Sequence, residues 1–98
     1  MKIIYTPCKN EQEAKKIAKI LLFEKLIACA NLIPSTSLYT WNGKQEEKNE
    51  IILIIKTSQA IKVEKRIVEL HSYSLPCILT FSAKANKDFE KWVKMNEH

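Results

Sequence analysis

Cysteine and histidine side chains are the groups in this sequence best suited to hold a metal ion. Cys29, Cys77 and His71 together offer two thiolates and an imidazole, a soft ligand set suited to Cu(I) or Zn²⁺. The cysteines are widely spaced and include no Cys-x-x-Cys pair, so spacing alone does not establish a site. The alternative is that both thiols are small buried apolar groups, as free cysteines commonly are. Both interpretations stay open at this stage.

Arrangements for nucleophilic catalysis have little support. Asp88 is the single Asp, so a Ser/His/Asp triad is unsupported, and no nucleophile elbow is present. A Cys77/His71 pair remains open, but two residues at this spacing are weak support. The single Gly excludes a Gly-rich phosphate loop. An acylphosphatase-like enzyme would need an Arg in the loop at 7–10, and the lone Arg66 lies elsewhere.

The composition is that of an ordinary globular protein, and residues 1–98 are expected to form one domain. The net charge of +5 comes from fifteen Lys and one Arg, spread along the chain among glutamates. Nucleic-acid readers usually carry clustered charge and favour Arg, so we interpret the lysines as a solvated surface and expect no nucleic-acid partner.

A cytoplasmic location is expected. The odd number of cysteines, with Cys8 as the third, argues for free thiols in a reducing compartment. The chain begins Met1-Lys2 and enters an apolar strand pattern without a secretion signal. The longest apolar run, Ile51 to Ile55, is far shorter than a membrane span, so no membrane partner is expected.

The hydrophobic pattern predicts four strands and three helices. Short apolar runs predict strands over 3–6, 28–39, 48–56 and 77–82. Apolar residues at helical spacing predict helices from the cap at Asn10 to about Lys25, from the cap at Thr57-Ser58 to about His71, and after Asn86. Pro34 cannot donate a ladder hydrogen bond, which places the second strand at a sheet edge or a bulge.

A long two-stranded ribbon turns at Asn42-Gly43, the strongest short hairpin signal in the sequence. A strict two-residue turn pairs Cys29 with Lys56, and a bulge at Pro34 would shift the pairs beyond it by one. Arms of about twelve residues would span roughly 40 Å. The radius of gyration of a domain this size is only about 13 Å, so the tip should protrude. Because a protruding apolar ribbon invites association, we expect it to be an interface.

The order β-α-β-β-α-β predicts an α+β fold of the ferredoxin-like kind, with the first and third strands central. The apolar run Ile51–Ile55 suits a central strand covered on both faces. An RNA-recognition domain shares this order, but this strand lacks the aromatic side chains that stack bases.

Almost the whole chain resembles CutA, the divalent-cation-tolerance family. The resemblance is most specific from Lys25 to Pro34 (KLIACANLIP) and from Ser37 to Lys44 (SLYTWNGK). The strand at 50–57, the His71-x-Tyr73-x-x-Pro76 motif and the closing Asp88-Phe89-x-x-Trp92 follow in the family's order. The chain departs from the family pattern at Tyr5, Leu70, Ser72 and Cys77.

The resemblance implies a homotrimer with a long second-to-third-strand hairpin and a short C-terminal helix. It also implies binding of copper or another divalent metal, a role in metal tolerance and no conventional enzymatic activity. In a closed ring the edge strands of neighbours meet, which would bring Cys29, Cys77 and His71 together as metal ligands. The positions of the family's suspected interface pocket are Cys29, Trp41, Lys56, Tyr73 and Trp92.

The alternative function is that of a small-ligand signalling trimer resembling the nitrogen-regulatory proteins, which share the fold and bind nucleotides between subunits. The absence of Gly-rich loops and the single Arg argue against nucleotide binding.

Overall fold

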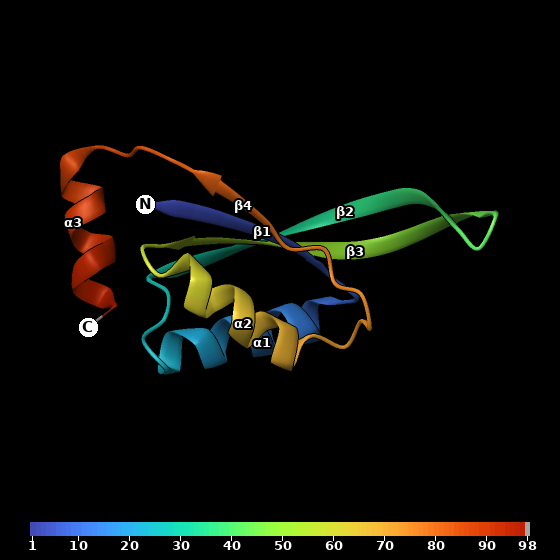
Figure 1. The fold of residues 1–98 in the computed structure, drawn as a ribbon, viewed down its shortest axis with the longest axis horizontal. Helices are drawn as coiled ribbons and strands as arrows, with labels where there is room; N and C mark the ends of the chain where they lie inside the picture. The colour runs from blue at the N-terminus through green and yellow to red at the C-terminus, as the bar shows by residue number, and fades with distance from the viewer. Residues whose placement is uncertain (98) are drawn as a thin grey trace.

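A computed structural model describes residues 1–97 and places two helices against one face of a four-stranded antiparallel sheet (Figure 1). The strand order is β2-β3-β1-β4, so the first and third strands are central and the ferredoxin-like prediction is confirmed. The elements are β1 (Lys2–Cys8), α1 (Glu11–Phe23), β2 (Cys29–Trp41), β3 (Lys44–Thr57), α2 (Ala60–Leu70), β4 (Leu79–Ser82) and α3 (Lys87–Asn96).

The β2–β3 ribbon follows the predicted register along its whole length, from Cys29 opposite Lys56 to Trp41 opposite Lys44. No bulge occurs at Pro34, which pairs with Ile51. The turn has φ of 52° at Asn42 and 76° at Gly43, the positive values that a type I′ turn requires. The ribbon extends well beyond the body of the molecule, whose overall dimensions are 46 × 24 × 21 Å (Figure 1).

The core lies between the helices and the sheet. Residues 4, 53 and 55 of the central strands are fully buried against Ile17, Leu21, Val63 and Ile67 of the helices. The first strand continues through Pro7 to Cys8, although the sequence pattern predicts a strand that ends at Thr6. The pairing of β1 with β4 ends at Tyr5, which lies opposite Leu79. At Pro7 the β4 side of β1 therefore has no strand to bond, and the proline's lack of an N–H breaks no ladder hydrogen bond there. Cys8 therefore belongs to β1 and faces the helices.

The fourth strand is shorter than predicted, and Cys77 lies in the connection that precedes it. After β4 the chain crosses to α3, which stands at the end of the sheet opposite the ribbon tip (Figure 1). Among the described helices none is long and apolar enough to cross a membrane.

A residue from the far end of the chain binds the segment that leads into α2. The cap position is Gln59 rather than Thr57-Ser58, and its own side chain makes no capping bond. Instead, Glu97 is 4% exposed and accepts hydrogen bonds from the Ser58 N–H at 3.0 Å and the Ser58 hydroxyl at 2.7 Å. Its other oxygen contacts the Thr57 hydroxyl, which in turn accepts the Gln59 N–H. The buried carboxylate thus fixes α3 to the body.

We expect Glu97→Ala to lower the free energy of unfolding by about 1–3 kcal/mol, because it removes the acceptor of the part-buried Ser58 donors and of the buried Thr57 hydroxyl. Urea unfolding at one fixed protein concentration measures the effect. Gln12→Ala, at an exposed position of α1 away from the ribbon, is the control and should change stability by no more than about 0.5 kcal/mol. Equal stability of the two variants would show that Glu97 does not fix α3.

Candidate functional site

Three ligand-type side chains from three different elements converge beneath the sheet. Cys8 ends β1, Glu13 lies in the first turn of α1, and His71 is the C-cap of α2. One potential ligand atom of each lies within 4.8 Å of the other two, and all three residues are buried. We call these residues the Cys8–Glu13–His71 cluster.

Hydrogen bonds fix the tautomer and the orientation of His71, whose side chain is completely buried. Nε2 lies 2.8 Å from the Pro7 carbonyl oxygen, which only accepts, so Nε2 carries the proton and donates. Nδ1 accepts the Tyr73 backbone N–H at 3.1 Å and lies 4.0 Å from Glu13 Oε1. The lone pair that could bind a metal is therefore the one on Nδ1.

Glu13 joins the loop after β1 to the end of α2. Its carboxylate accepts the Lys9 N–H at 3.1 Å and the Ser72 N–H at 3.1 Å. The expected reach back to the Asn10 N–H is absent, although the Asn10 side chain caps α1 by accepting the Glu13 N–H at 2.8 Å. Burial by itself raises the pKa of Glu13, but the hydrogen bonds from Ser72 and Lys9 and the nearby His71 outweigh it and leave the pKa lowered.

The Cys8 thiol is held in its neutral form. Burial, followed by the negative charges of Glu13 and Glu50, raises its pKa to about 12. Its Sγ lies 3.8 Å from the Thr6 carbonyl oxygen, a weak hydrogen bond. The Thr6 hydroxyl, two residues earlier on the same strand, is buried without a hydrogen-bond partner among the described residues. A metal ion would have to replace the thiol proton.

A hollow of about 580 Å³ opens where the ribbon leaves the body, and we call it the ribbon-neck hollow. Tyr73 forms its inner wall, donating its hydroxyl to Glu50 Oε2 at 2.7 Å, while the Lys48 ammonium lies 4.5 Å from the centre of its ring. Burial, then this bond to Glu50, raises the pKa of Tyr73. The hollow is lined by Pro7, Tyr39, Trp41, Glu46, Lys48, Glu50, Ser72, Tyr73, Ser74, Leu75 and Cys77.

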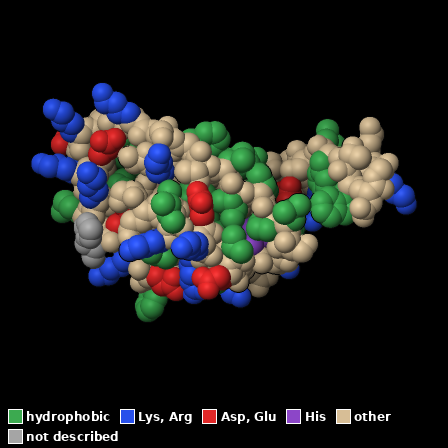
Figure 2. All heavy atoms as spheres, viewed as in Figure 1, with side chains coloured by type: hydrophobic (Ala, Val, Ile, Leu, Met, Phe, Trp, Pro, Cys, Tyr) green, Lys and Arg blue, Asp and Glu red, His purple; other side chains and the backbone are tan. Residues whose placement is uncertain are grey.

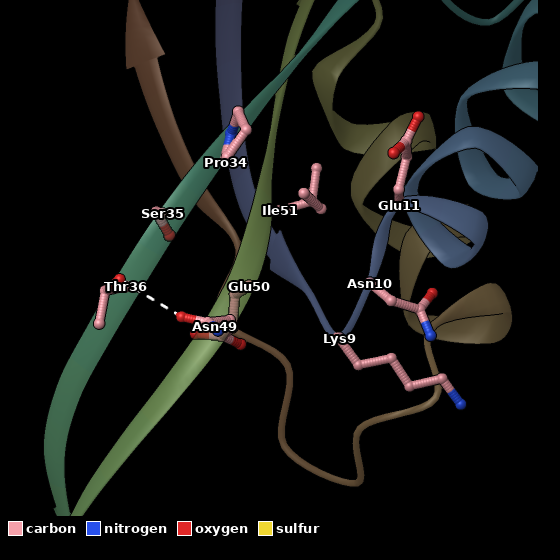
Figure 3. A pocket seen from close by; sticks show the side chains of 9 residues that line it. All are labelled: Lys9, Asn10, Glu11, Pro34, Ser35, Thr36, Asn49, Glu50 and Ile51. Atoms are coloured by element: carbon pink, nitrogen blue, oxygen red, sulfur yellow. Dashed lines mark hydrogen bonds between the residues drawn. The ribbon is translucent and has the colours of Figure 1, made fainter.

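A second hollow of about 590 Å³ shares Glu50 with the first and lies beside the start of α1 (Figure 3). Lys9 and Asn10 stand on one side of it, and Thr36 and Asn49, joined by a hydrogen bond of 3.4 Å, stand on the ribbon side (Figure 3). Its lining offers no set of ligands comparable to the cluster.

In a single chain the five predicted pocket residues do not converge. Trp41 and Tyr73 line the ribbon-neck hollow. Cys29 and Lys56 are paired at the other end of the ribbon, where the Lys56 ammonium donates to the Asn31 side chain. Trp92 lies in α3 beyond that end, 42% exposed and stacked on Phe89, and Val93 rather than Trp92 is the buried residue of that helix.

The predicted metal ligands are also separated within one chain. His71 lies in the cluster, Cys77 is exposed at the ribbon-neck hollow, and Cys29 is half-buried at the start of β2. Because the expected meeting of Cys29 and Cys77 involves two subunits, it stays a prediction.

Comparison with known proteins identifies the family. A family model described as CutA1 divalent ion tolerance protein matches residues 2–96. This chain belongs to the CutA1 family. The resemblance read from the hairpin and Lys25–Pro34 motifs is confirmed.

The similarity to other CutA1 proteins extends over the whole chain. The divalent-cation tolerance protein CutA of Pyrococcus horikoshii is 41% identical over 96 residues, covering 95% of this chain and 94% of the relative. The solved structure of the periplasmic divalent cation tolerance protein CutA from Archaeoglobus fulgidus has a TM-score of 0.95 at 34% identity and covers 100% of both chains. A structure described as PII-like protein CutA from Nostoc has a TM-score of 0.93 at 31% identity, covering 100% of this chain and 98% of the other.

Sequence reasoning did not assign a ligand role to Cys8 or Glu13. The sequence pattern predicts that the first strand ends before Pro7, which leaves Cys8 in a loop. The alternation of Ile4, Thr6 and Cys8 was the available signal, since side chains two apart on a strand share a face. The position of Glu13 three residues after Asn10 indicates only a helix cap, and nothing in its spacing indicates that α2 ends beside it.

We expect Glu13→Gln to lower the free energy of unfolding at pH 7 by about 1–3 kcal/mol, because an amide cannot accept both N–H donors in this geometry. The folded pKa of Glu13 is lowered, so its contribution is present above the unfolded value of about 4.3 and is lost as pH falls through the folded value. The difference from the parent protein should therefore shrink between pH 5 and pH 3 in urea unfolding. Glu11→Gln, on the exposed side of the same turn, is the matched control; a loss as large as that of Glu13→Gln would contradict the assignment.

Proposed function

We propose that this CutA1 protein is a homotrimer that binds Cu(I) or Zn²⁺ at the Cys8–Glu13–His71 cluster of each subunit, and that it acts in metal tolerance by binding rather than by catalysis. The observation that carries the proposal is the convergence of a thiol, a carboxylate and an imidazole within 4.8 Å in a buried position. This donor set suits Zn²⁺ and copper and is poorly matched to Mg²⁺ or Ca²⁺, which prefer oxygen ligands.

The surroundings of His71 support the same proposal. Histidines that bind metals usually donate their other ring N–H to a carbonyl or carboxylate, which fixes the ring and its tautomer. Here Nε2 already donates to the Pro7 carbonyl, which leaves Nδ1 on the side of Glu13. A bound cation would also lower the pKa of the Cys8 thiol and take the place of its proton.

A metal site formed between subunits by Cys29, Cys77 and His71 is the competing location. His71 belongs to both ligand sets, so a His71 variant alone does not separate them. The cysteines do separate them, because Cys8 is buried inside one chain and Cys77 is exposed.

We expect Cys8→Ser to reduce the affinity for Zn²⁺ or Cu(I) at least tenfold, because loss of a residue that only supports a metal ligand already costs about ten- to a hundredfold, and Cys8 is proposed as a ligand itself. Anaerobic competition with a chromophoric chelator measures affinity and stoichiometry, and circular dichroism confirms that the variants fold. The double variant Cys29→Ser/Cys77→Ser is the control and should bind one ion per chain with unchanged affinity.

The reverse result, binding lost in the double variant and kept in Cys8→Ser, would move the site to the subunit interface. Failure of the parent protein to bind either ion would refute the metal proposal. A rise in melting temperature with ATP, and none with Zn²⁺ or Cu(I), would favour a small-ligand signalling function. That second candidate has its own support in the ribbon-neck hollow and in the PII-like description of the Nostoc structure.

The trimer proposal rests on apolar surface that one chain leaves uncovered. Ile33, Leu79 and Phe81 are 48%, 46% and 51% exposed and lie on the sheet face opposite the helices. Hydrophobic side chains gather over the middle of the molecule and at the root of the ribbon, whereas Lys and Arg side chains lie at the end that carries α3 and along the lower, helix side (Figure 2). β2 and β4 are the edge strands, each with one side unpaired among residues 1–97. Copies of the chain joined along these edges would cover both the exposed apolar side chains and the unpaired strand edges.

Light scattering at micromolar concentration should give a mass three times that of the 11.4 kDa chain. Phe81→Lys places a charge on the uncovered sheet face and should shift the distribution toward smaller species. Ile61→Lys, at a 73% exposed position of α2 on the helix side, is the control and should remain trimeric. A monomeric parent protein would contradict the proposal.

We retain the cytoplasmic location as part of the proposal. Its support is that Cys8, Cys29 and Cys77 are all free thiols. The Archaeoglobus fulgidus relative, by contrast, is described as periplasmic.

A further inference from the structure

Tyr73 occupies the position that a metal ion on His71 would need. The imidazole presents one lone pair, on Nδ1, and the Tyr73 N–H donates to it at 3.1 Å. The other nitrogen is held by the Pro7 carbonyl at 2.8 Å. Coordination through Nδ1 therefore keeps the bond that orients the ring and breaks the one to Tyr73, whose backbone must move away.

The side chain of Tyr73 connects this position to the ribbon. Its ring centre lies 4.8 Å from that of His71. Its hydroxyl donates to Glu50 of β3, and Lys48 of the same strand lies over the ring. One residue thus blocks the metal-binding nitrogen with its backbone and forms the wall of the ribbon-neck hollow with its side chain.

An ion can reach the cluster only if the segment that contains Tyr73 moves. Cys8 is completely buried, and His71 and Glu13 are 8% and 9% exposed, so an ion reaches them only if part of the cover moves. Residues 71–78 between α2 and β4 have neither helical nor strand structure. Ser72 and Tyr73, at the start of this connection, are tied to the cluster by the two hydrogen bonds to Glu13 and His71. This connection is the part of the cover with the fewest ladder or helix bonds to break.

We propose that metal binding at the Cys8–Glu13–His71 cluster and the shape of the ribbon-neck hollow are coupled through Tyr73. This inference rests on the proposed metal site. An ion on Nδ1 releases the Tyr73 N–H, and the ring then loses its fixed place between His71, Glu50 and Lys48. The coupling is reciprocal by thermodynamic necessity, so any contact that holds Tyr73 in the hollow lowers the affinity of the cluster for the metal.

The first test follows Zn²⁺ binding by three signals in a Trp92→Phe background, in which Trp41 is the only tryptophan. Calorimetry reports binding, Trp41 emission reports the hollow, and the Tyr73 amide resonance with its hydrogen-exchange rate reports the bond to Nδ1. We expect the emission and the amide resonance to change with the same midpoint as the heat, and exchange of the Tyr73 amide to become at least tenfold faster at saturation.

The second test loosens Tyr73 without touching the cluster. Tyr73→Phe keeps the ring and the backbone N–H but removes the bond to Glu50, and it should raise Zn²⁺ affinity about three- to tenfold, the equivalent of one hydrogen bond. Tyr39→Phe, which lines the same hollow, is the matched control and should leave the affinity unchanged.

The outcomes separate the two proposals. Heat of binding with no change at Trp41 or at the Tyr73 amide would overturn the coupling, indicate coordination without displacement of Tyr73, and leave the metal site intact. An unchanged affinity in Tyr73→Phe would likewise overturn it. Absence of any heat in the parent protein would refute the metal site and the coupling together.

Discussion

The register of the β2–β3 ladder determines where almost every side chain of the sheet points. It depends on a turn of two residues, Asn42 and Gly43, that both take positive φ. A shift of one residue would exchange the two faces of the ribbon, because side chains alternate along a strand. In the observed register Leu53 and Ile55 face the helices, while Lys48 and Glu50 face the ribbon neck. The core and the ribbon-neck hollow are therefore consequences of the same turn.

Under the metal proposal, the cluster beneath the sheet would have to meet two requirements that oppose each other. Stability favours the arrangement as it stands, with Glu13 accepting two N–H donors, both nitrogens of His71 bonded and the Cys8 thiol neutral. Metal binding favours a thiolate, a free Nδ1 and an opening toward solvent. A buried site that is fully hydrogen-bonded without metal resists adventitious ions, because every incoming ion must first break existing bonds. A metal site at this cluster would therefore select ions with high affinity for sulfur and nitrogen.

The sheet face opposite the helices and the ribbon both expose apolar side chains. Apolar side chains of β2 and β4 remain exposed opposite the helices, and the ribbon extends beyond the body with Leu38 73% and Trp41 51% exposed. Within one chain these surfaces have no cover among the described residues, which a soluble domain of this size rarely tolerates over a wide area. Assembly would cover them and would bring the ribbon neck of one subunit against another, so the hollow and Tyr73 would lie close to a subunit boundary.

The amino-acid sequence by itself determined the order of elements, the hairpin with its two-residue turn and the family. These depend on local rules: hydrophobic period, the positive φ of Asn42-Gly43, and a motif read in order along the chain. The sequence left open a bulge at Pro34 and the shift in register that a bulge would cause, and the structure shows an unbroken ladder there. Only the tertiary structure decided that Cys8, Glu13 and His71 meet, that Trp92 stands far from Trp41 in one chain (Figure 1), and that Glu97 binds Ser58 just before α2. Each of these arrangements involves residues that are distant in sequence, and it depends on the angles at which the elements pack and on the lengths of the loops between them. No local pattern specifies those contacts, because the free energy that selects them belongs to the packed core as a whole.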